Sequence, residues 1–292
     1  MNLVGAFDIH LHCAPDVTAR AQDFMDLAQH ASRLGMAGIG LKDHVTSTVG
    51  RCFALNRLFP NGPRFFSSLV LNPPVGGMNP AAVEAALQAG ADVIYFPTYS
   101  ALHHVQTLGP EVSPVPHPRR GVQQLEALSD GLLKADVIEI IDLIVEHDAV
   151  LATGHLSPAE SLAILKRGAE CGARRMLVTH ASEIVPCMSV DQQREAVGLG
   201  ARIEHCLLAA TECCPGTIEL SEIARQIRLV GVDHVILSSD FGQPANGAPL
   251  DAFGNYLDRL AQEGFSSQEI RTLICDNPRT LLCEGRAPCS QF

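Results

Sequence analysis

Short apolar runs that end in histidine or aspartate recur along this chain, and they constrain its fold more than any other feature. The runs are rich in Val, Ile, Leu and Ala, are bounded by Gly, Ser or Pro, and are separated by segments of helical character. Strands of a parallel sheet that is covered on both faces have this composition. The residues that stand at the ends of these runs are His10, His12, His155, His180 and Asp240.

Eight such runs predict eight strands, with helices between them. The strands are expected at residues 4–10, 38–42, 65–71, 92–96, 150–153, 176–179, 202–205 and 235–238. Helices are expected at residues 21–34, 49–58, 80–89, 135–147, 158 onward, 190–199, 218–230 and 250–263, with a short one in 266–282. Asn79 before Pro80, and Ser157 three residues before Glu160, are helix-start signals. One (β/α)8 TIM-barrel domain over residues 1–292 accounts for this order and length.

The strand ends of such a barrel converge on one face, so the five residues should meet although they are far apart in sequence. His10 and His12 are two positions apart on a strand, which places them on the same side, about 7 Å apart at the backbone. Imidazole nitrogen with carboxylate oxygen is the ligand set of a hydrolytic divalent metal. The His-x-His motif alone is also compatible with two buried core histidines. Its combination with His155, His180 and Asp240 favours a metal site.

This arrangement resembles the amidohydrolase superfamily, whose barrel carries His-x-His on strand one, histidines on strands five and six, and an aspartate on strand eight. The DNPRTLL ending is similar to a turn of that superfamily, and the stretches GLKDH, LATGHLS and SSDFGQP resemble an uncharacterised, domain-of-unknown-function branch. The resemblance implies that His10, His12, His155 and Asp240 hold a divalent metal. It implies that His180 binds a second ion or orients the substrate. The chain departs from the binuclear pattern at DVIYFPTYS, which has no bridging lysine or glutamate, so one and two ions per chain both stay open.

Lys42 and His44 stand at the end of the expected second strand. Lys42 is one of only three lysines in the chain. We expect it to attract an anionic substrate, to act as a base of lowered pKa, or, by analogy with relatives, to bridge two ions as a carboxylated ligand. The alternative is a simple ion pair with Asp43. His44 is expected to contact the substrate.

A proline-rich connection over residues 100–120 carries further candidates. Because it follows a strand, it should lie on the metal face, as an active-site lid or an oligomer contact, with a solvated excursion as the alternative. The expected substrate contacts within it are His103, His104, Arg119 and Arg120. On the expected seventh strand, Glu204 and His205 should face opposite sides, and His205 is a candidate for the substrate pocket or for a buried structural role.

The amino-acid composition limits the classes of molecule that the protein is expected to bind. The net charge of −11 argues against nucleic acid and anionic membranes, which require a basic face. The amino terminus has no basic and apolar leader, and no run reaches the length of a membrane helix. The ten cysteines lack a paired framework. We therefore expect a cytoplasmic protein that acts on a small molecule and forms a homo-oligomer.

The expected activity is a metal-dependent hydrolysis. A divalent ion, zinc with manganese as the alternative, would activate water, Asp240 would take its proton, and His180 or Lys42 would stabilise the developing oxyanion. The bond would be an amide, imide, lactone or similar C–N or C–O bond in a small molecule, plausibly an anionic one. Three alternatives stay open. They are a phosphoesterase of the polymerase-and-histidinol-phosphatase type, a decarboxylase similar to aminocarboxymuconate-semialdehyde decarboxylase, and a metal-stabilised binding scaffold.

Overall fold

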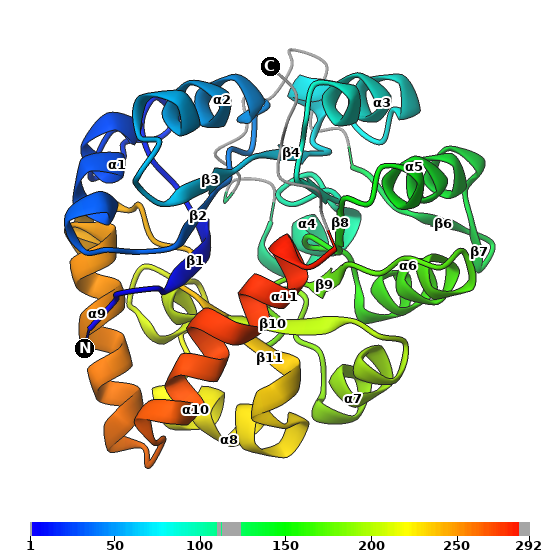
Figure 1. The fold of residues 1–292 in the computed structure, drawn as a ribbon. Coiled ribbons are helices and arrows are strands. Elements are labelled where there is room, and N and C mark those ends of the chain that lie inside the picture. The colour runs from blue at the N-terminus through cyan, green and yellow to red at the C-terminus, as the bar shows by residue number, and fades with distance from the viewer. Residues whose placement is uncertain (1, 110–111, 113–123, 286–292) are drawn as a thin grey trace.

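A ring of parallel strands forms the centre of the protein in the computed structural model, which describes residues 2–109, 112 and 124–285. The strands pair in chain order, with helices around them (Figure 1). The strands are β1 (Phe7–Leu11), β2 (Gly38–Leu41), β3 (Arg64–Phe66), β4 (Ser68–Val70), β5 (Val93–Tyr95), β8 (Val150–Ala152), β9 (Met176–Val178), β10 (Arg202–Cys206) and β11 (Val235–Ser238). Every pair in this ring is parallel, as the continuous apolar runs predicted.

Two junctions complete the ring. β3 and β4 are separated only by Ser67, whose carbonyl still accepts from the backbone of Val93, so the two short strands act as one member of the barrel. At the other junction the amide of Asp240 donates to the carbonyl of His10 at 2.8 Å, and the amide of His12 donates to Phe241 at 2.8 Å. These bonds join the first strand to the segment after the last. The predicted (β/α)8 barrel is confirmed.

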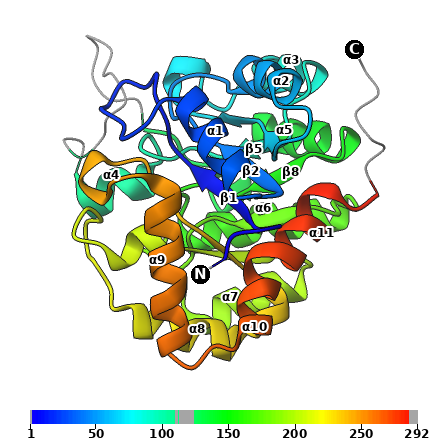
Figure 2. The same ribbon diagram turned by 60° about the vertical axis from the view of Figure 1, so that its left-hand side comes forward.

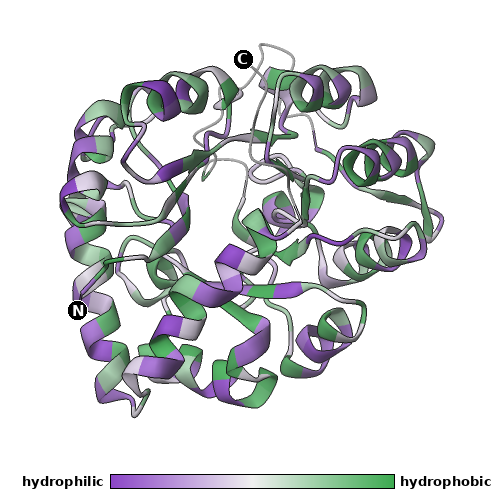
Figure 3. Cartoon of the chain, viewed as in Figure 1, coloured by the Kyte–Doolittle hydropathy of each residue, from purple (hydrophilic) through white to green (hydrophobic). Residues whose placement is uncertain are grey.

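The helices surround the ring and bury one side each. They are α1 (Phe24–Arg33), α2 (Val49–Leu58), α3 (Pro80–Gln88), α5 (Ala135–Glu146), α6 (Pro158–Glu170), α7 (Val190–Gly198), α8 (Leu220–Val230) and α9 (Pro249–Gln262). In α8, Ile223, Ile227 and Val230 recur at helical spacing and are buried. Figure 3 shows hydrophobic and hydrophilic sides on the outer helices. The caps at Asn79 and Ser157 form as predicted, the second as a full capping box with Glu160.

The two ends of the barrel differ. At the start of the strands, Leu281 and Leu282 of α11 (Asn277–Cys283) pack against Phe7 and Val93. A short helix α10 (Ser267–Arg271) and a π-helical turn (Thr272–Asp276) lead into α11. Helix α4 (Leu102–Leu108) lies at the other end, where the strands finish (Figure 2). Among the described residues, no helix combines the length and apolar character needed to cross a membrane.

The connection before α5 differs from the expected loop. Its first part forms α4, a run of seven residues that is too short to show clear periodicity in the sequence. Further on, β6 (Leu128–Ser129) and β7 (Leu132–Leu133) form a hairpin. Asp130 and Gly131, with φ of 51° and 78°, make its turn. An Asp-Gly pair is a strong signal for a two-residue hairpin, so this element was visible in the sequence and was missed.

Candidate metal centre

His10, His12 and Asp240 form a buried cluster at the junction of the first and last strands. Asp240 Oδ1 lies 3.2 Å from His10 Nε2 and 3.0 Å from His12 Nε2. One ligand atom from each residue lies within 4.8 Å of the others. The two histidines share a side because β1 places alternate residues on one face, and the closure bond from Asp240 to His10 fixes the third member beside them. Two nitrogens and one oxygen therefore converge on one point.

Glu204 on β10 holds the other side of the His10 ring. Glu204 Oε2 lies 3.1 Å from His10 Nδ1 and also accepts from the backbone amide of His180 at 3.2 Å. Burial alone would raise the pKa of this carboxyl, but the charge of His10 and its hydrogen bond lower the pKa to about 2. An ionised Glu204 keeps the proton of His10 on Nδ1 and leaves Nε2 as the ligand atom.

Burial and the neighbouring charges act in opposite directions on the pKa values in this cluster. Burial works against ionisation of Asp240, yet the neighbouring His10 and His12 hold its pKa well below the usual range, so the carboxylate is charged. Burial lowers the pKa of His10, but Asp240 and Glu204 outweigh it and raise that pKa to about 9, so the ring is protonated at pH 7 and must release its Nε2 proton when a cation binds there. Burial and, next, the charge of Arg20 lower the pKa of His12 to about 4, so this ring is neutral at pH 7. The cluster thus offers an anion and imidazole nitrogens.

Lys42 lies next to this cluster. Its Nζ is 2.9 Å from His10 Nε2 and 4.8 Å from the centre of the Tyr95 ring. Burial lowers the pKa of the amine. The alternative pairing with Asp43 does not form, because Arg51 occupies that carboxylate at 2.7 Å. Lys42 is thus placed to act on the cluster, and it does not line the cavity described below.

His180 and Glu183 follow β9 and form a second group with Asp240. One ligand atom from each of the three lies within 4.8 Å of the others. His180 has a φ of 30° and Asp240 a φ of 53°, in a region that residues other than glycine seldom occupy. Strained backbone of this kind concentrates at functional sites. Both strands thus turn sharply where their side chains enter the site.

Four aromatic rings form one wall above the cluster. His44 stacks on His12 at 4.7 Å between ring centres and meets Tyr99 at 4.5 Å. Tyr99 contacts His104 of α4, which stacks on His155 with their Nδ1 atoms 2.9 Å apart. Burial holds the pKa values of His44 and His155 well below the usual range, and lowers that of His104 to about 4. The wall is therefore uncharged near neutral pH.

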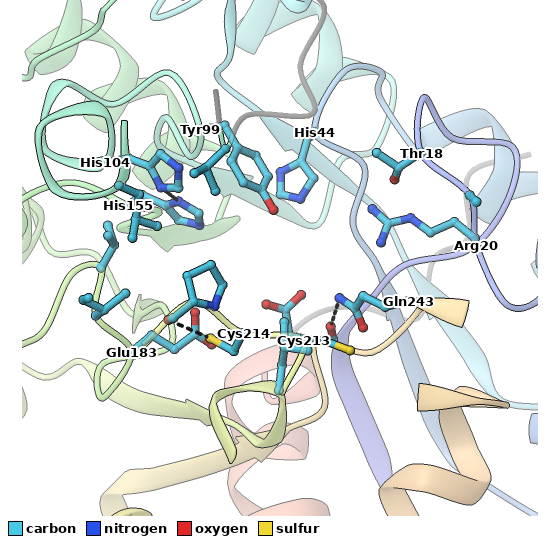
Figure 4. A pocket seen from close by; sticks show the side chains of 18 of the residues that line it. Thr18, Arg20, His44, Tyr99, His104, His155, Glu183, Cys213, Cys214 and Gln243 are labelled. Carbon is cyan, nitrogen blue, oxygen red and sulfur yellow. Dashed lines mark hydrogen bonds between the residues drawn. The ribbon is translucent and has the colours of Figure 1, made fainter. Parts of the chain in front are cut away.

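A cavity of about 310 Å³ opens between this wall and the acidic side of the site. Figure 4 shows His44, Tyr99, His104 and His155 on one side, facing Glu183, Cys213, Cys214 and Gln243 across a gap. Asp240 also lines the cavity. Arg20 lies at one edge of it, where its guanidinium binds Asp16 through Nε and a terminal nitrogen, both at 2.7 Å. The cavity has the size of a small-molecule site.

The predicted candidates separate into those at the cavity and those away from it. His155 lies beside His180, at 4.7 Å between ring centres, but outside the two clusters that contain Asp240. His205 lies on the face of β10 opposite Glu204, and Ser182 Oγ contacts its Nδ1 at 2.9 Å, away from the cavity. His103 is on α4 but does not line the cavity. Arg119 and Arg120 lie outside the described residues.

Residues that sequence reasoning missed come mainly from loops. Glu183 and Arg20 lie in the segments that follow β9 and β1, and Tyr99 follows β5. All three obey the rule that segments after barrel strands build the site. No spacing pattern marked them. Glu204 was identified as one of two strand residues of which only one could face inward, and the structure selects it.

The donor atoms fit a divalent cation. Several buried atoms in the site lack a hydrogen-bond partner, among them His12 Nδ1, His104 Nε2, His180 Nδ1, Glu183 Oε1 and Glu204 Oε1. Unpartnered buried polar atoms are costly and therefore uncommon. Imidazole and carboxylate donors together suit zinc and related divalent ions. The residues present thus agree with a divalent metal, as the sequence predicted.

Comparison with known proteins shows that the barrel has the fold of several solved hydrolases. An amidohydrolase from Pseudomonas aeruginosa has a TM-score of 0.62 at 12% identity, over 94% of this chain and 95% of the other. A putative 2-pyrone-4,6-dicarboxylic acid hydrolase from Pseudomonas putida gives 0.60 at 13%, over 97% and 98%. An organophosphorus hydrolase from Deinococcus radiodurans gives 0.59 at 14%, over 96% and 93%. At these identities the likeness shows the shared fold.

The chain belongs to DUF6282, a family of unknown function whose model matches residues 5–204. The matched region runs from before β1 to Glu204 in β10, so it contains both histidines of β1 but ends before Asp240. No match was found among curated proteins. The predicted membership of a domain-of-unknown-function family is confirmed.

Proposed function

We propose that this protein is a metal-dependent hydrolase that cleaves a C–N or C–O bond, such as an amide, imide or lactone, in a small molecule. The observation that carries the proposal is the buried group of His10, His12 and Asp240, whose Asp240 lines a cavity of about 310 Å³. We assign His10 Nε2, His12 Nε2 and Asp240 Oδ1 as ligands of zinc, with manganese as the alternative. His155 is proposed to stand next to this set, held by His104.

When bound, such an ion lowers the pKa of water and polarises a carbonyl oxygen. Asp240 is ionised and lines the cavity, so we propose that it accepts the proton of the nucleophile and transfers it to the leaving group. Glu204 keeps the His10 proton on Nδ1. His180 and Lys42 lie beside the cluster and outside the lining of the cavity, and we propose that they stabilise negative charge on a substrate oxygen that reaches the cluster.

The cavity favours a flat, unsaturated substrate. The ring faces of His44, Tyr99 and His104 offer stacking, and their neutral state at pH 7 offers hydrogen bonds without a charge. Arg20 can meet an anionic group only partly, because Asp16 already neutralises it. The described residues of the cavity therefore offer little positive charge to an anionic substrate. We propose that His44 and His104 bind a polar but uncharged group.

Metal content and product analysis test this proposal. Protein purified without chelators should contain a divalent ion, and chelation should abolish hydrolysis of the active members of an amide, imide and lactone panel. Changing His10 and His12 together to alanine should remove the metal. Full activity of metal-free protein would sink the proposal. Release of carbon dioxide or phosphate would point to the decarboxylase or phosphoesterase alternatives, and a fully loaded protein without turnover to a binding scaffold.

We also propose a cytoplasmic location and a homo-oligomeric state. In support of the first, all nine cysteines in the described segments are free thiols. Light scattering on the purified protein tests the second, and a monomeric mass over the working concentration range would refute it.

A further inference from the structure

Glu183 is a buried carboxyl group that the proposed reaction does not use. It follows β9 by a few residues, is 9% exposed and lines the cavity. Its Oε1 has no hydrogen-bond partner. Figure 4 shows its side chain on the side of the cavity opposite His104 and His155. A buried carboxylate oxygen without a partner is costly, so this position calls for a hydrogen-bond donor or a positive charge.

The described neighbours of Glu183 do not supply such a partner. The closest basic nitrogen among them is His180 Nδ1, which lies 3.7 Å from Glu183 Oε2, too far for a hydrogen bond. Burial and the charge of Lys42 lower the pKa of His180 to about 3, so its ring is uncharged at pH 7. The Lys42 amine itself contacts His10 Nε2 at 2.9 Å. The carboxyl group therefore faces the cavity without a positive partner from the described part of the chain.

The charges that line the cavity are negative in balance. Asp240 is charged, and it lies with Glu183 and His180 in a group whose ligand atoms are all within 4.8 Å of one another. Among the described lining residues, Arg20 is the one arginine or lysine, and its guanidinium already binds Asp16. Burial and the charge of Asp240 raise the pKa of Glu183 well above its usual range, as expected for a carboxyl group that lacks a positive partner.

The wall opposite Glu183 accepts a positively charged ligand. Tyr99 meets His104 at 4.9 Å and His155 at 5.4 Å between ring centres. Burial lowers the pKa of His104 to about 4 and holds that of His155 well below its usual range, so neither ring repels a cation near pH 7. A tyrosine ring attracts a cation that lies over its face. A protonated nitrogen thus fits between this wall and Glu183.

The distance to Asp240 determines where such a nitrogen stands in the ligand. One carboxylate oxygen of Glu183 lies within 4.8 Å of one oxygen of Asp240. This separation corresponds to about three covalent bonds of roughly 1.5 Å each. Because Asp240 is assigned as the base at the scissile bond, a nitrogen that Glu183 holds must be within a few bonds of the scissile carbon.

We propose that Glu183 binds a protonated nitrogen of the substrate, and that the substrate is a small amide or lactone with an amino group on the carbon next to the scissile carbonyl. This inference rests on the proposed function, which places the scissile bond at Asp240. Glu183 accepts hydrogen bonds from the ammonium group and so determines specificity. It neither binds the metal nor transfers a proton.

Matched substrate pairs test the inference. Alaninamide and lactamide carry an ammonium or a hydroxyl group beside the same amide, and α-amino-γ-butyrolactone and α-hydroxy-γ-butyrolactone form the corresponding lactone pair. With metal-loaded protein, kcat/KM should be higher for each amine by about tenfold to a hundredfold, the range expected for hydrogen bonds to a charged group. In Glu183→Gln this preference should disappear, while kcat/KM for the hydroxyl compounds should change little. Saturation-transfer NMR measures binding of the same four compounds independently of turnover.

Two variants and a metal count control for indirect effects. Glu212→Gln removes the same charge from an exposed residue in the segment after β10, and it should keep the preference for amines. Glu183→Asp keeps the charge on a shorter side chain and should retain part of that preference. Each variant should bind as much metal as wild type. Loss of an ion from Glu183→Gln would make the carboxylate a metal ligand and would overturn the inference.

The outcomes separate the inference from the proposed function. Hydrolysis without a preference for the amines, or with a preference that survives Glu183→Gln, refutes only the inference. Binding of the amines that depends on Glu183, without hydrolysis, supports the role of Glu183 and contradicts the proposed function. If none of the four compounds binds or is hydrolysed, the inference is refuted, and the wider panel of amides, imides and lactones decides the proposed function.

Discussion

Replacement of Glu204 by glutamine should lower the affinity for the ion assigned to His10, His12 and Asp240, although it changes none of these ligands. The carboxylate binds His10 Nδ1 at 3.1 Å and the amide of His180 at 3.2 Å, and it is fully buried. Glutamine keeps an acceptor oxygen of similar reach but loses the charge. Loss of such a partner behind a metal-binding histidine typically lowers affinity tenfold to a hundredfold, or about 1.4 to 2.7 kcal/mol.

Competition with a chromophoric chelator measures this affinity directly. Glu139→Gln, on an exposed position of α5, is the matched control and should bind the ion as wild type does. Nitrogen-15 spectra of the histidines provide a second readout, because the metal-loaded wild type should carry the His10 proton on Nδ1. An unchanged affinity in Glu204→Gln, or a His10 proton on Nε2 in wild type, would contradict the assigned role of Glu204.

Three further predictions follow from the site and its surroundings. Asp240→Asn should lower kcat by about a hundredfold to ten-thousandfold and reduce metal affinity modestly with little change in Tm; near-normal kcat in metal-loaded mutant protein would remove Asp240 as the base. Burial lowers the pKa of His205 from 6.5 to about 4, so the unfolded state binds more protons between these values and stability should fall as pH drops from about 6.5 to about 4. Urea unfolding at both ends of that window should show a smaller loss in His205→Gln, and an equal loss would mean that other groups cause it. Gly154→Ala should destabilise the protein by more than about 3 kcal/mol, because its φ is 63° and the new Cβ would lie 2.2 Å from the Phe96 carbonyl; thermal unfolding measures this, and an unchanged Tm would contradict the packing at that turn.

The ring of strands was predictable because its sequence signal is strong. Buried parallel strands need apolar residues on both faces, which makes runs such as VILS in β11 conspicuous. His10 and His12 were predictable for a related reason, since their spacing fixes a common side. Helix α2 was placed at its observed bounds, whereas α4 was missed because seven residues with two adjacent histidines give little periodicity.

The contacts around the cluster were less predictable, because strand order alone does not determine side-chain reach. Lys42 was expected to serve the substrate, the metal or Asp43, and only the structure shows its amine at His10. His155 stands at the end of the expected strand, yet its Nδ1 contacts His104. His104 lies on α4, a helix that the sequence did not predict. Glu183 lies three residues past His180 in an irregular loop, where no periodic rule decides which side chains turn inward.

The bond between the first and last strands has a consequence for folding. Ser239 donates its amide to Asp8 Oδ1 across 231 residues of chain, next to the closure bond of Asp240 and His10. Bringing together two segments so far apart in sequence has an entropic cost that grows as the logarithm of loop length. This cost is a free energy on the order of 5 kcal/mol for such a separation. An ion that binds only the folded state, at a free concentration a thousand times its Kd, stabilises that state by about 4 kcal/mol. A metal bound both by β1 and by the segment after β11 would therefore offset much of the free energy needed to close the barrel. Its release would destabilise the junction between these two parts of the chain, and we expect the barrel to open there first.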